Sequence, residues 1–167
     1  MTIKEKHNKF LEIYLPVQDN LWRYSLFMTR NRELAKELLA ETIAKAYTSF
    51  DKIKSEQAFL SYLFTIASRT FYAQCEKKKV ENFVECDFEN LFITNNYESA
   101  DYEELYDNLN KLPREQRETL ILFYIEGFSR KELANIQNIS EETVKSRLAR
   151  GKKTMAKLMG AQLEYED

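Results

Sequence analysis

Residues 129–150 read SRKELANIQNISEETVKSRLAR and contain two helical patterns on either side of a short turn. Ser129 and Glu132 have the spacing of a capping box, in which the hydroxyl and the carboxylate each bind a backbone amide at a helix start. Asn138 is a residue type that tolerates positive φ, and Ser140 can cap a second helix. The spacing predicts a helix-turn-helix, with a short helix, a tight turn and a longer helix.

The second helix is expected to carry a basic outer face. Val144, Leu148 and Met155 recur at helical spacing and should point inward. A helix fits the major groove of B-DNA, and Lys and Arg neutralise phosphates, so the pattern favours DNA binding. The spacing leaves open an ordinary helical hairpin with a solvated basic face. The candidate contacts are the base readers Lys145 and Arg147, assisted by Thr143 and Ser146, and the phosphate-binding residues Arg130, Lys131, Arg150 and Lys153.

The preceding segment predicts a further helix of the same domain. Pro113 lies where a first helical turn tolerates proline, and the apolar pattern continues from Glu115 to Tyr124. Gly127 can adopt the left-handed conformation that ends a helix.

The N-terminal 79 residues predict a bundle of three or four helices. Helical patterns cover Ile3 to Tyr14 and Val17 to Met28, with Pro16 forcing a kink or a new first turn. Asn31 and Ser55 can each cap a further helix, and the last helix is expected to end near Lys79. In the third helix the stripe expected to face the core contains Leu34, Leu38, Leu39 and Ile43.

The charges are unevenly distributed along the chain. Residues 1–79 and 111–160 each carry a net charge of +5, whereas residues 80–110 carry −9 with no Lys or Arg. The last seven residues add −3. A block of like charges resists compaction, so residues 80–104 predict an acidic tether. This tether also contains large apolar residues such as Phe83 and Phe92, which indicate a capacity to bind a partner.

The composition argues against several protein classes. With 3 Gly and 2 Pro in 167 residues, a β-sandwich or a Gly-rich phosphate loop is disfavoured. One His and two Cys disfavour a structural zinc site and a His-based catalytic triad, and no other catalytic cluster stands out. We therefore expect no enzyme, no metal and no cofactor. Cys75 and Cys86 are expected to be reduced thiols, and no segment is apolar enough to predict membrane insertion.

The C-terminal part of the chain contains four characteristic segments, LPREQR at 112–117, YIEGFS at 124–129, ELA at 132–134 and TVKSRLARG at 143–151. Through these segments, residues 105–158 resemble the C-terminal DNA-binding region of bacterial sigma factors. In that family this module, region 4, recognises the promoter −35 element. The resemblance thus implies that the DNA contacts proposed above are made with a −35 element.

The N-terminal unit resembles region 2 of the same family. ELLAETI at 37–43 and YLFTIA at 62–67 stand where the family has its Asp-x-x-Gln-Glu and Trp-Leu-x-x-Ile-Ala patterns. Ala40 replaces the usual Gln, and Ser68-Arg69 replaces the usual Arg-Asn. The resemblance implies a polymerase contact through Glu37, Glu41 and Lys45. It also implies −10 element contacts through Lys52, Lys54, Ser55, Gln57, Tyr62, Arg69 and Tyr72.

Two such regions without a further domain resemble the extracytoplasmic-function (ECF) subfamily. The predicted fold is all-α, with a region 2-like bundle at 1–79, an acidic flexible linker at 80–104, a region 4-like domain at 105–160 and an acidic tail at 161–167. The implied protein is a cytoplasmic sigma factor that binds RNA polymerase core and promoter DNA, with an anti-sigma factor as a further candidate partner. The region 2 departures motivate one alternative, a sigma-like protein without promoter activity that binds a regulator or polymerase.

Overall fold

The computed structural model describes residues 1–53, 55–81 and 100–160, without the side chains of residues 57, 79–81 and 100–102. Every regular element in these ranges is helical, which confirms the predicted all-α class. The chain divides into two compact units, Met1–Phe92 and Ile93–Asp167.

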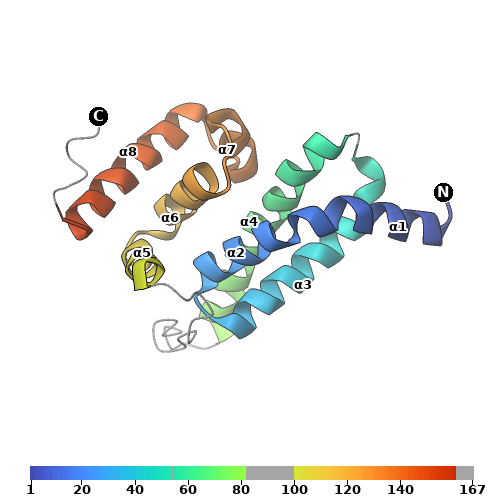
Figure 1. Cartoon of the computed structure of the whole chain (residues 1–167), viewed down its shortest axis with the longest axis horizontal. Helices are drawn as coiled ribbons and strands as arrows, with labels where there is room; N and C mark the ends of the chain where they lie inside the picture. The colour runs from blue at the N-terminus through green and yellow to red at the C-terminus, as the bar shows by residue number, and fades with distance from the viewer. Residues whose placement is uncertain (54, 82–99, 161–167) are drawn as a thin grey trace. The chain divides into compact units, whose positions relative to one another are not determined.

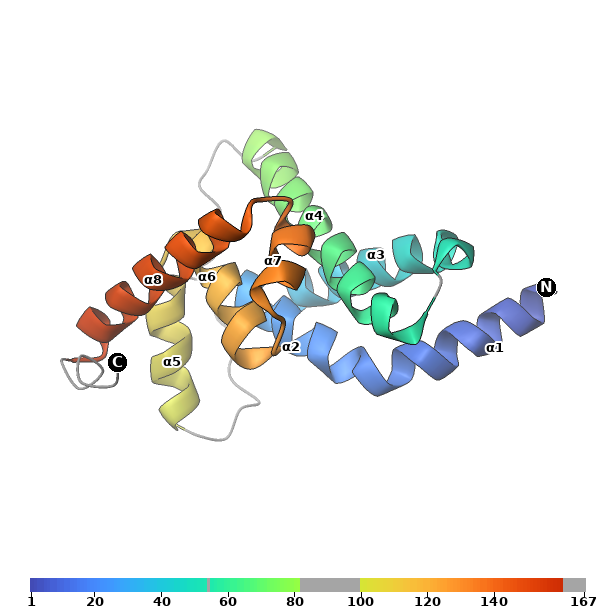
Figure 2. The same ribbon diagram turned by 90° about the horizontal axis from the view of Figure 1, so that it is seen from above.

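Unit 1 is a bundle in which α2 and α4 both pack against α3 (Figures 1 and 2). Its elements are α1 (Ile3–Tyr14), the 3₁₀ turn η1 (Leu15–Val17), α2 (Gln18–Thr29), α3 (Arg32–Thr48), the 3₁₀ turn η2 (Phe50–Lys52) and α4 (Glu56–Glu81).

The helix boundaries of unit 1 follow local signals. Pro16 lies in η1, so the chain changes direction there without a gap between helices. The Asn31 side chain accepts a hydrogen bond from the Leu34 amide at 2.9 Å, and Ser55 accepts one from the Ala58 amide at 3.2 Å. Both predicted caps are confirmed.

The core of unit 1 combines aliphatic side chains with an aromatic cluster. Leu21, Leu38 and Leu63 have no exposed surface. Phe10 of α1 makes edge contacts with Phe50 and Phe59, which join α1 to η2 and α4. The aromatic contacts therefore attach the first helix to the loop between α3 and α4.

The buried face of α3 differs from the predicted stripe. Ala35, Leu38, Thr42 and Ala46 are buried. Leu38 is the member of the predicted stripe that is fully buried, whereas Leu34, Leu39 and Ile43 are only half-buried. The prediction was wrong for these three residues because α3 packs between α2 and α4 through its small residues, which leaves the larger side chains at the flanks.

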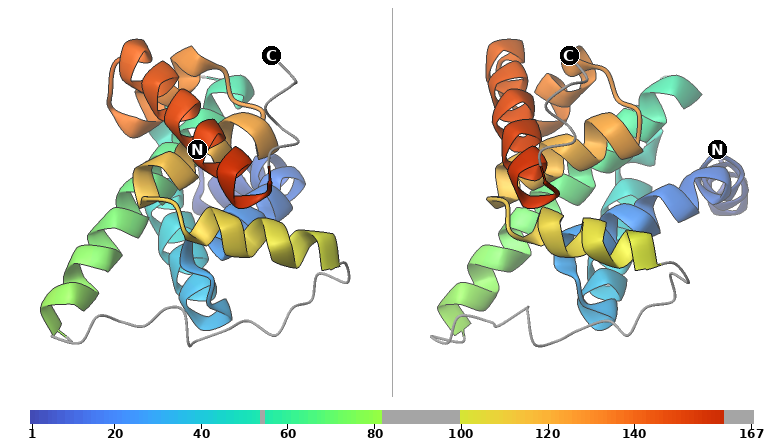
Figure 3. Two further views of the ribbon diagram at one scale, coloured as in Figure 1. Left: turned by 90° about the vertical axis from the view of Figure 1, so that its left-hand side faces the viewer. Right: turned by 60° about the vertical axis from the view of Figure 1, so that its left-hand side comes forward.

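Unit 2 contains a short helical scaffold and a helix-turn-helix (Figure 3). Helix α6 and helix α7 both pack against α8. The elements are α5 (Ala100–Asn110), α6 (Arg114–Leu120), the π-helical segment η3 (Ile121–Ile125), α7 (Arg130–Gln137) and α8 (Glu141–Leu158).

The turn of unit 2 forms as predicted. Ser129 and Glu132 form the capping box of α7, and Ser140 caps α8 by accepting a hydrogen bond from the Thr143 amide at 3.1 Å. Asn138 ends α7 with a φ of 54°, and Gly127 has a φ of 78°. Positive φ is the conformation that Gly and Asn adopt at least cost.

Two helix boundaries differ from the predicted ones. Helix α4 continues to Glu81, and α5 begins at Ala100, so residues 80–81 and 100–104 of the predicted linker are helical.

The predicted helix from Glu115 to Tyr124 changes from α to π after Leu120, because the Glu126 amide donates to the Ile121 carbonyl, five residues back. Most of the predicted tether, the tail 161–167 and Cys86 lie outside the described residues.

Candidate functional site

The outer face of α8 is set by the residues that anchor its inner face. Val144, Leu148, Gly151 and Met155 are buried. Residues that are four and seven positions apart share a helix face, so Ser146, Arg150 and Lys153 lie together on the side opposite this core. Arg150 and Lys153 are exposed, and Ser146 is half-buried.

The two predicted base readers lie on different flanks of α8. Lys145 and Arg147 are separated by about 200° around the axis, at about 100° per residue. Lys145 is exposed and Arg147 is half-buried. The hydroxyl of Thr143 lies 2.8 Å from that of Ser140, so this predicted reader contributes to the helix cap. Ser146 thus lies between the two basic side chains, on the central outward face.

The first turn of α7 adds two cations to the same unit. Arg130 and Lys131 follow the Ser129 cap directly and are both exposed. Helix α7 packs against α8 (Figure 2), so one small domain carries the exposed basic residues of both helices. This arrangement suits a nucleic-acid duplex, with one helix in a groove and flanking cations on the phosphates.

A buried polar cluster beneath the turn was missed by the sequence analysis. Glu118 and Thr119 of α6 are buried, with exposed fractions of 1% and 0%. The amide of Gln137, the last residue of α7, donates to Glu118 Oε1 at 2.8 Å. Thr119 Oγ1 lies 3.2 Å from Gln137 Oε1. No spacing rule connects residues 118 and 137, so only the folded structure brings them together.

In unit 1 several predicted −10 contacts gather at one end and along one face of α4. Ser55, Tyr62 and Arg69 recur at seven-residue spacing, and a seven-residue step returns to the same helix face. Arg69 is exposed, whereas Tyr62 and Tyr72 are half-buried. The other predicted contacts are Lys52, exposed at the end of η2, Lys54, which lies outside the described residues, and Gln57, of which the structure describes only the backbone.

Tyr62 is held by the loop that precedes α4. Its hydroxyl hydrogen-bonds with that of Ser49, at the end of α3. Burial raises the pKa of the Tyr62 phenol above its ordinary value, so the group stays a neutral hydrogen-bonding phenol near pH 7. The Ser49 hydroxyl therefore helps to fix where the Tyr62 hydroxyl lies.

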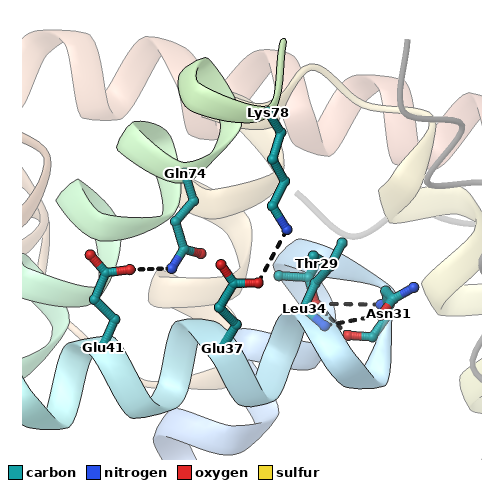
Figure 4. A network of polar contacts seen from close by, with 7 residues as sticks. All are labelled: Thr29, Asn31, Leu34, Glu37, Glu41, Gln74 and Lys78. Atoms are coloured by element: carbon teal, nitrogen blue, oxygen red, sulfur yellow. Dashed lines mark hydrogen bonds and ion pairs between the residues drawn. The ribbon is translucent and has the colours of Figure 1, made fainter. Parts of the chain in front are cut away.

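The three predicted polymerase contacts form one polar ladder between α3 and α4, and Figure 4 shows the part of it that contains Glu37 and Glu41. Glu37 pairs with Lys78 at 3.3 Å, and Glu41 accepts a hydrogen bond from Gln74 at 2.5 Å. Lys45 contacts Thr70 at 3.3 Å and Glu41 at 3.1 Å. The ladder advances four residues on α3 for each four-residue return on α4, as expected for antiparallel helices.

The ladder alters the titration of Glu41. The hydrogen bond from Gln74 is the largest cause that lowers the Glu41 pKa below its ordinary value, and Lys45 adds to the effect. The carboxylate is thus ionised at neutral pH and partly exposed at the edge of the bundle.

Both units match models of known protein families. Residues 13–80 match Sigma-70 region 2, and residues 102–155 match Sigma-70, region 4. The chain is 32% identical over 155 residues to the ECF RNA polymerase sigma factor SigM of Bacillus subtilis (strain 168), which covers 88% of this chain and 93% of the relative. The chain belongs to the sigma-70 family.

Further relatives of this sigma factor agree on the subfamily. It is 27% identical to the ECF sigma factor EcfG of Rhodopseudomonas palustris (strain TIE-1), over 84% of this chain and 79% of the relative. The structure of the sigma factor RpoE from Bartonella quintana, solved in complex with the anti-sigma factor NepR, matches with a TM-score of 0.79 and 27% identity. That match covers 95% of this chain and 99% of the other. The predicted ECF class is confirmed, and the chain is an RNA polymerase sigma factor that directs transcription.

Among the described residues, no group of three or more His, Cys, Asp or Glu side chains is placed to hold a metal ion. Within the same ranges, no helix has the length and apolar character required to cross a membrane. Cys75 is buried within α4.

Proposed function

We propose that the two units of this sigma factor divide promoter recognition, with unit 2 binding the −35 element and unit 1 binding core polymerase and the −10 element. The observation that carries the proposal is the outward basic face of α8, the second helix of a helix-turn-helix in which side chains cap the start of both helices. The proposed domains are those predicted from the sequence, 1–79 and 105–160, joined by the acidic segment.

In unit 2, Lys145 and Arg147 are proposed to read base edges, assisted by Thr143 and Ser146. Arg130, Lys131, Arg150 and Lys153 are proposed to bind phosphates and set the register. Since Lys145 and Arg147 lie on different flanks of α8, each is expected to specify a different base pair of the site.

Single substitutions in the protein distinguish the base readers from the phosphate contacts. The binding affinity of each protein variant is measured for a selected duplex and for duplexes that differ from it at one base pair, across a salt series. Arg147→Ala and Lys145→Ala should each cost about 1–3 kcal/mol and relax specificity at one position. Lys153→Ala, the matched control on the same helix, should weaken all duplexes alike and reduce the salt slope by about 1. An even loss for every duplex in Arg147→Ala would remove Arg147 from the readers.

In unit 1, the proposed −10 site consists of the segment from η2 to Ser55 together with the Tyr62, Arg69 and Tyr72 side of α4. Melting of promoter DNA is favoured when a protein captures an unstacked base beside basic residues. An exposed cation and two half-buried aromatic rings on one helix support this role. Tyr62→Phe should leave the stacking face intact, whereas Tyr62→Ala should reduce open-complex formation without affecting duplex −35 binding.

The α3 edge that carries Glu37, Glu41 and Lys45 is proposed as the polymerase contact. Because Glu41 also bonds Gln74, the two roles of its carboxylate need separate variants. Glu41→Lys should weaken holoenzyme assembly, and Gln74→Met, which keeps the carboxylate but removes the internal hydrogen bond, should weaken it far less. Wild-type affinity of Glu41→Lys for core polymerase would exclude this surface.

An anti-sigma factor is the further partner that we propose, because the similar sigma factor RpoE was solved in complex with the anti-sigma factor NepR. The role of this sigma factor beside polymerase supports a cytoplasmic location and action without catalysis of its own.

Run-off transcription with purified core polymerase distinguishes promoter-specific initiation from the alternative, a sigma-like protein that only binds a regulator or polymerase. Specific transcripts support promoter recognition, and their absence at saturating factor supports the alternative.

A further inference from the structure

The cluster of Glu118, Thr119 and Gln137 joins α6 to the end of α7, next to the turn that precedes α8. Glu118 is a carboxylate with an exposed fraction of 1%, on a helix that contacts α8. A carboxylate at this depth requires hydrogen-bond donors, since burial without them is strongly unfavourable. The side-chain amide of Gln137 supplies one such donor at 2.8 Å.

Gln137 donates its amide nitrogen to the buried Glu118 carboxylate, and this pair sets the direction of the Gln137 side chain. Thr119 Oγ1 lies 3.2 Å from Gln137 Oε1, but its one proton makes the closer bond to the Glu115 carbonyl at 2.6 Å. Hydrogen bonds are directional, whereas an apolar side chain at the same place would tolerate sliding. The pair therefore restricts where the end of α7 can lie on α6.

The position of Gln137 in the chain makes this restriction matter for α8. Gln137 is the last residue of α7, Asn138 turns the chain with positive φ, and Ser140 already caps α8. The Ile139 amide donates to the Ala134 carbonyl at 3.0 Å, so the turn has little freedom of its own. A shift at residue 137 is consequently transmitted to the first turns of α8.

We propose that Gln137 is a positioning residue for promoter recognition, which acts through Glu118 to set the orientation of α8 on the −35 element. This inference rests on the proposed function of unit 2. Gln137 itself is not expected to contact DNA, because its side chain points to the buried face of α6. Its effect is on discrimination between duplexes.

The test exchanges the two partners in the full-length protein. Gln137→Glu places two carboxylates at hydrogen-bond distance, and adding Glu118→Gln restores an amide–carboxylate pair with the roles reversed. Asn135→Glu is the matched control, since residue 135 lies on the exposed side of α7 and adds the same charge away from Glu118. Wild-type protein first selects a preferred duplex from a random pool.

Affinities for that duplex and its single-base variants are then measured at one salt concentration, at a temperature well below unfolding. Gln137→Glu should lose at least tenfold in affinity for the selected duplex and most of its discrimination. Glu118→Gln/Gln137→Glu should recover to within about threefold of wild type, as expected for residues coupled in a double-mutant cycle. Asn135→Glu should keep wild-type discrimination, with only an even loss across duplexes.

The milder Gln137→Met covers the case in which Gln137→Glu does not fold. It removes the hydrogen bonds without adding charge, and it should reduce discrimination at least threefold while remaining folded by circular dichroism. Wild-type discrimination in a folded Gln137→Glu or Gln137→Met variant, or no recovery in the double variant, overturns the inference. If the wild-type protein itself selects no duplex, the proposed function of unit 2 fails instead.

Discussion

Thr42 and Tyr14 each bury a hydroxyl group inside unit 1. Thr42 has no exposed surface and Tyr14 is 3% exposed, and neither hydroxyl has a hydrogen-bond partner among the described residues. Burial, with a smaller contribution from Asp19, raises the pKa of Tyr14 to about 12. A buried hydroxyl without a partner loses its bonds to water without compensation, so each of these two hydroxyl groups costs free energy on folding.

Replacing Thr42 by Val should therefore stabilise unit 1, because the two side chains have similar shape and Val removes the buried hydroxyl. We expect a gain of about 1 kcal/mol, which raises Tm by roughly 4–8 °C in a domain of this size. Thr48→Val is the control, since the exposed Thr48 hydroxyl donates to the Ala44 carbonyl at 2.9 Å and should give no such gain. A lower Tm in Thr42→Val, by thermal denaturation followed by circular dichroism, would contradict the prediction.

The Glu41–Gln74 hydrogen bond should make the bundle sensitive to acid. The folded pKa of Glu41 lies below the ordinary value of 4.5, so its stabilisation is present above pH 4.5 and is lost as the pH falls through the folded pKa. Gln74→Met should raise the Glu41 pKa in an NMR titration and flatten the acid limb of the stability curve. Lys36→Met, which removes an ion pair with Glu33 on the same helix, should leave the Glu41 titration unchanged.

At the scale of elements, the contact between α6 and α8 depends on Gly151. A Cβ atom built there would lie 3.0 Å from Leu120 Cδ1 and 3.1 Å from Leu120 Cγ. Glycine in a helix interior costs about 1 kcal/mol relative to alanine, and here it permits the two helices to approach closely. An alanine at this position would need Leu120 to move.

Gly151→Ala is expected to lower the Tm of unit 2, because overpacking in a close-packed contact costs about 1–3 kcal/mol against a propensity gain of about 1 kcal/mol. In a Leu120→Ala background the same substitution should raise Tm, since the obstructing side chain is gone. The measurement is a double-mutant cycle by chemical denaturation. Stabilisation in both backgrounds would show that Leu120 moves at little cost.

The whole chain combines two basic segments, residues 1–79 and 111–160, with an acidic segment between them. Residues 80–110 contain nine acidic residues and neither Lys nor Arg. The basic segments on either side suit nucleic-acid phosphates, whereas the acidic segment would be repelled by them. The basic residues thus lie in the two segments proposed to bind DNA, and the acidic residues lie in the segment that connects them.

Limited proteolysis of the isolated protein should cut first between Val80 and Asp101. Trypsin is unsuitable there because residues 80–110 offer no Lys or Arg, so chymotrypsin and a glutamate-specific protease are the appropriate probes. The expected early products are fragments that correspond to the two units. Equal resistance of this segment and of the helical units would exclude the proposed domain organisation.

Local signals in the sequence were sufficient for much of the fold. The capping box at Ser129, the caps at Asn31 and Ser140 and the positive φ of Asn138 each depend on hydrogen bonds or backbone preferences within a few residues. The same short-range patterns carried the sigma-factor resemblance. Fold class, the helix-turn-helix and the family could therefore be predicted without coordinates.

Contacts between helices were decided only by tertiary packing. The pairing of Glu118 with Gln137 joins residues 19 positions apart, and that of Glu41 with Gln74 joins residues 33 apart. Their geometry depends on how one helix is rotated and shifted against another. Sequence periodicity gives the apolar side of a helix but not its rotation to within one residue, which is why Leu34 and Ile43 were misplaced and the Gly151–Leu120 contact was not foreseen. The helix caps and turns of this chain are determined by neighbouring residues in the sequence, whereas the placement of its buried polar groups follows from helix packing.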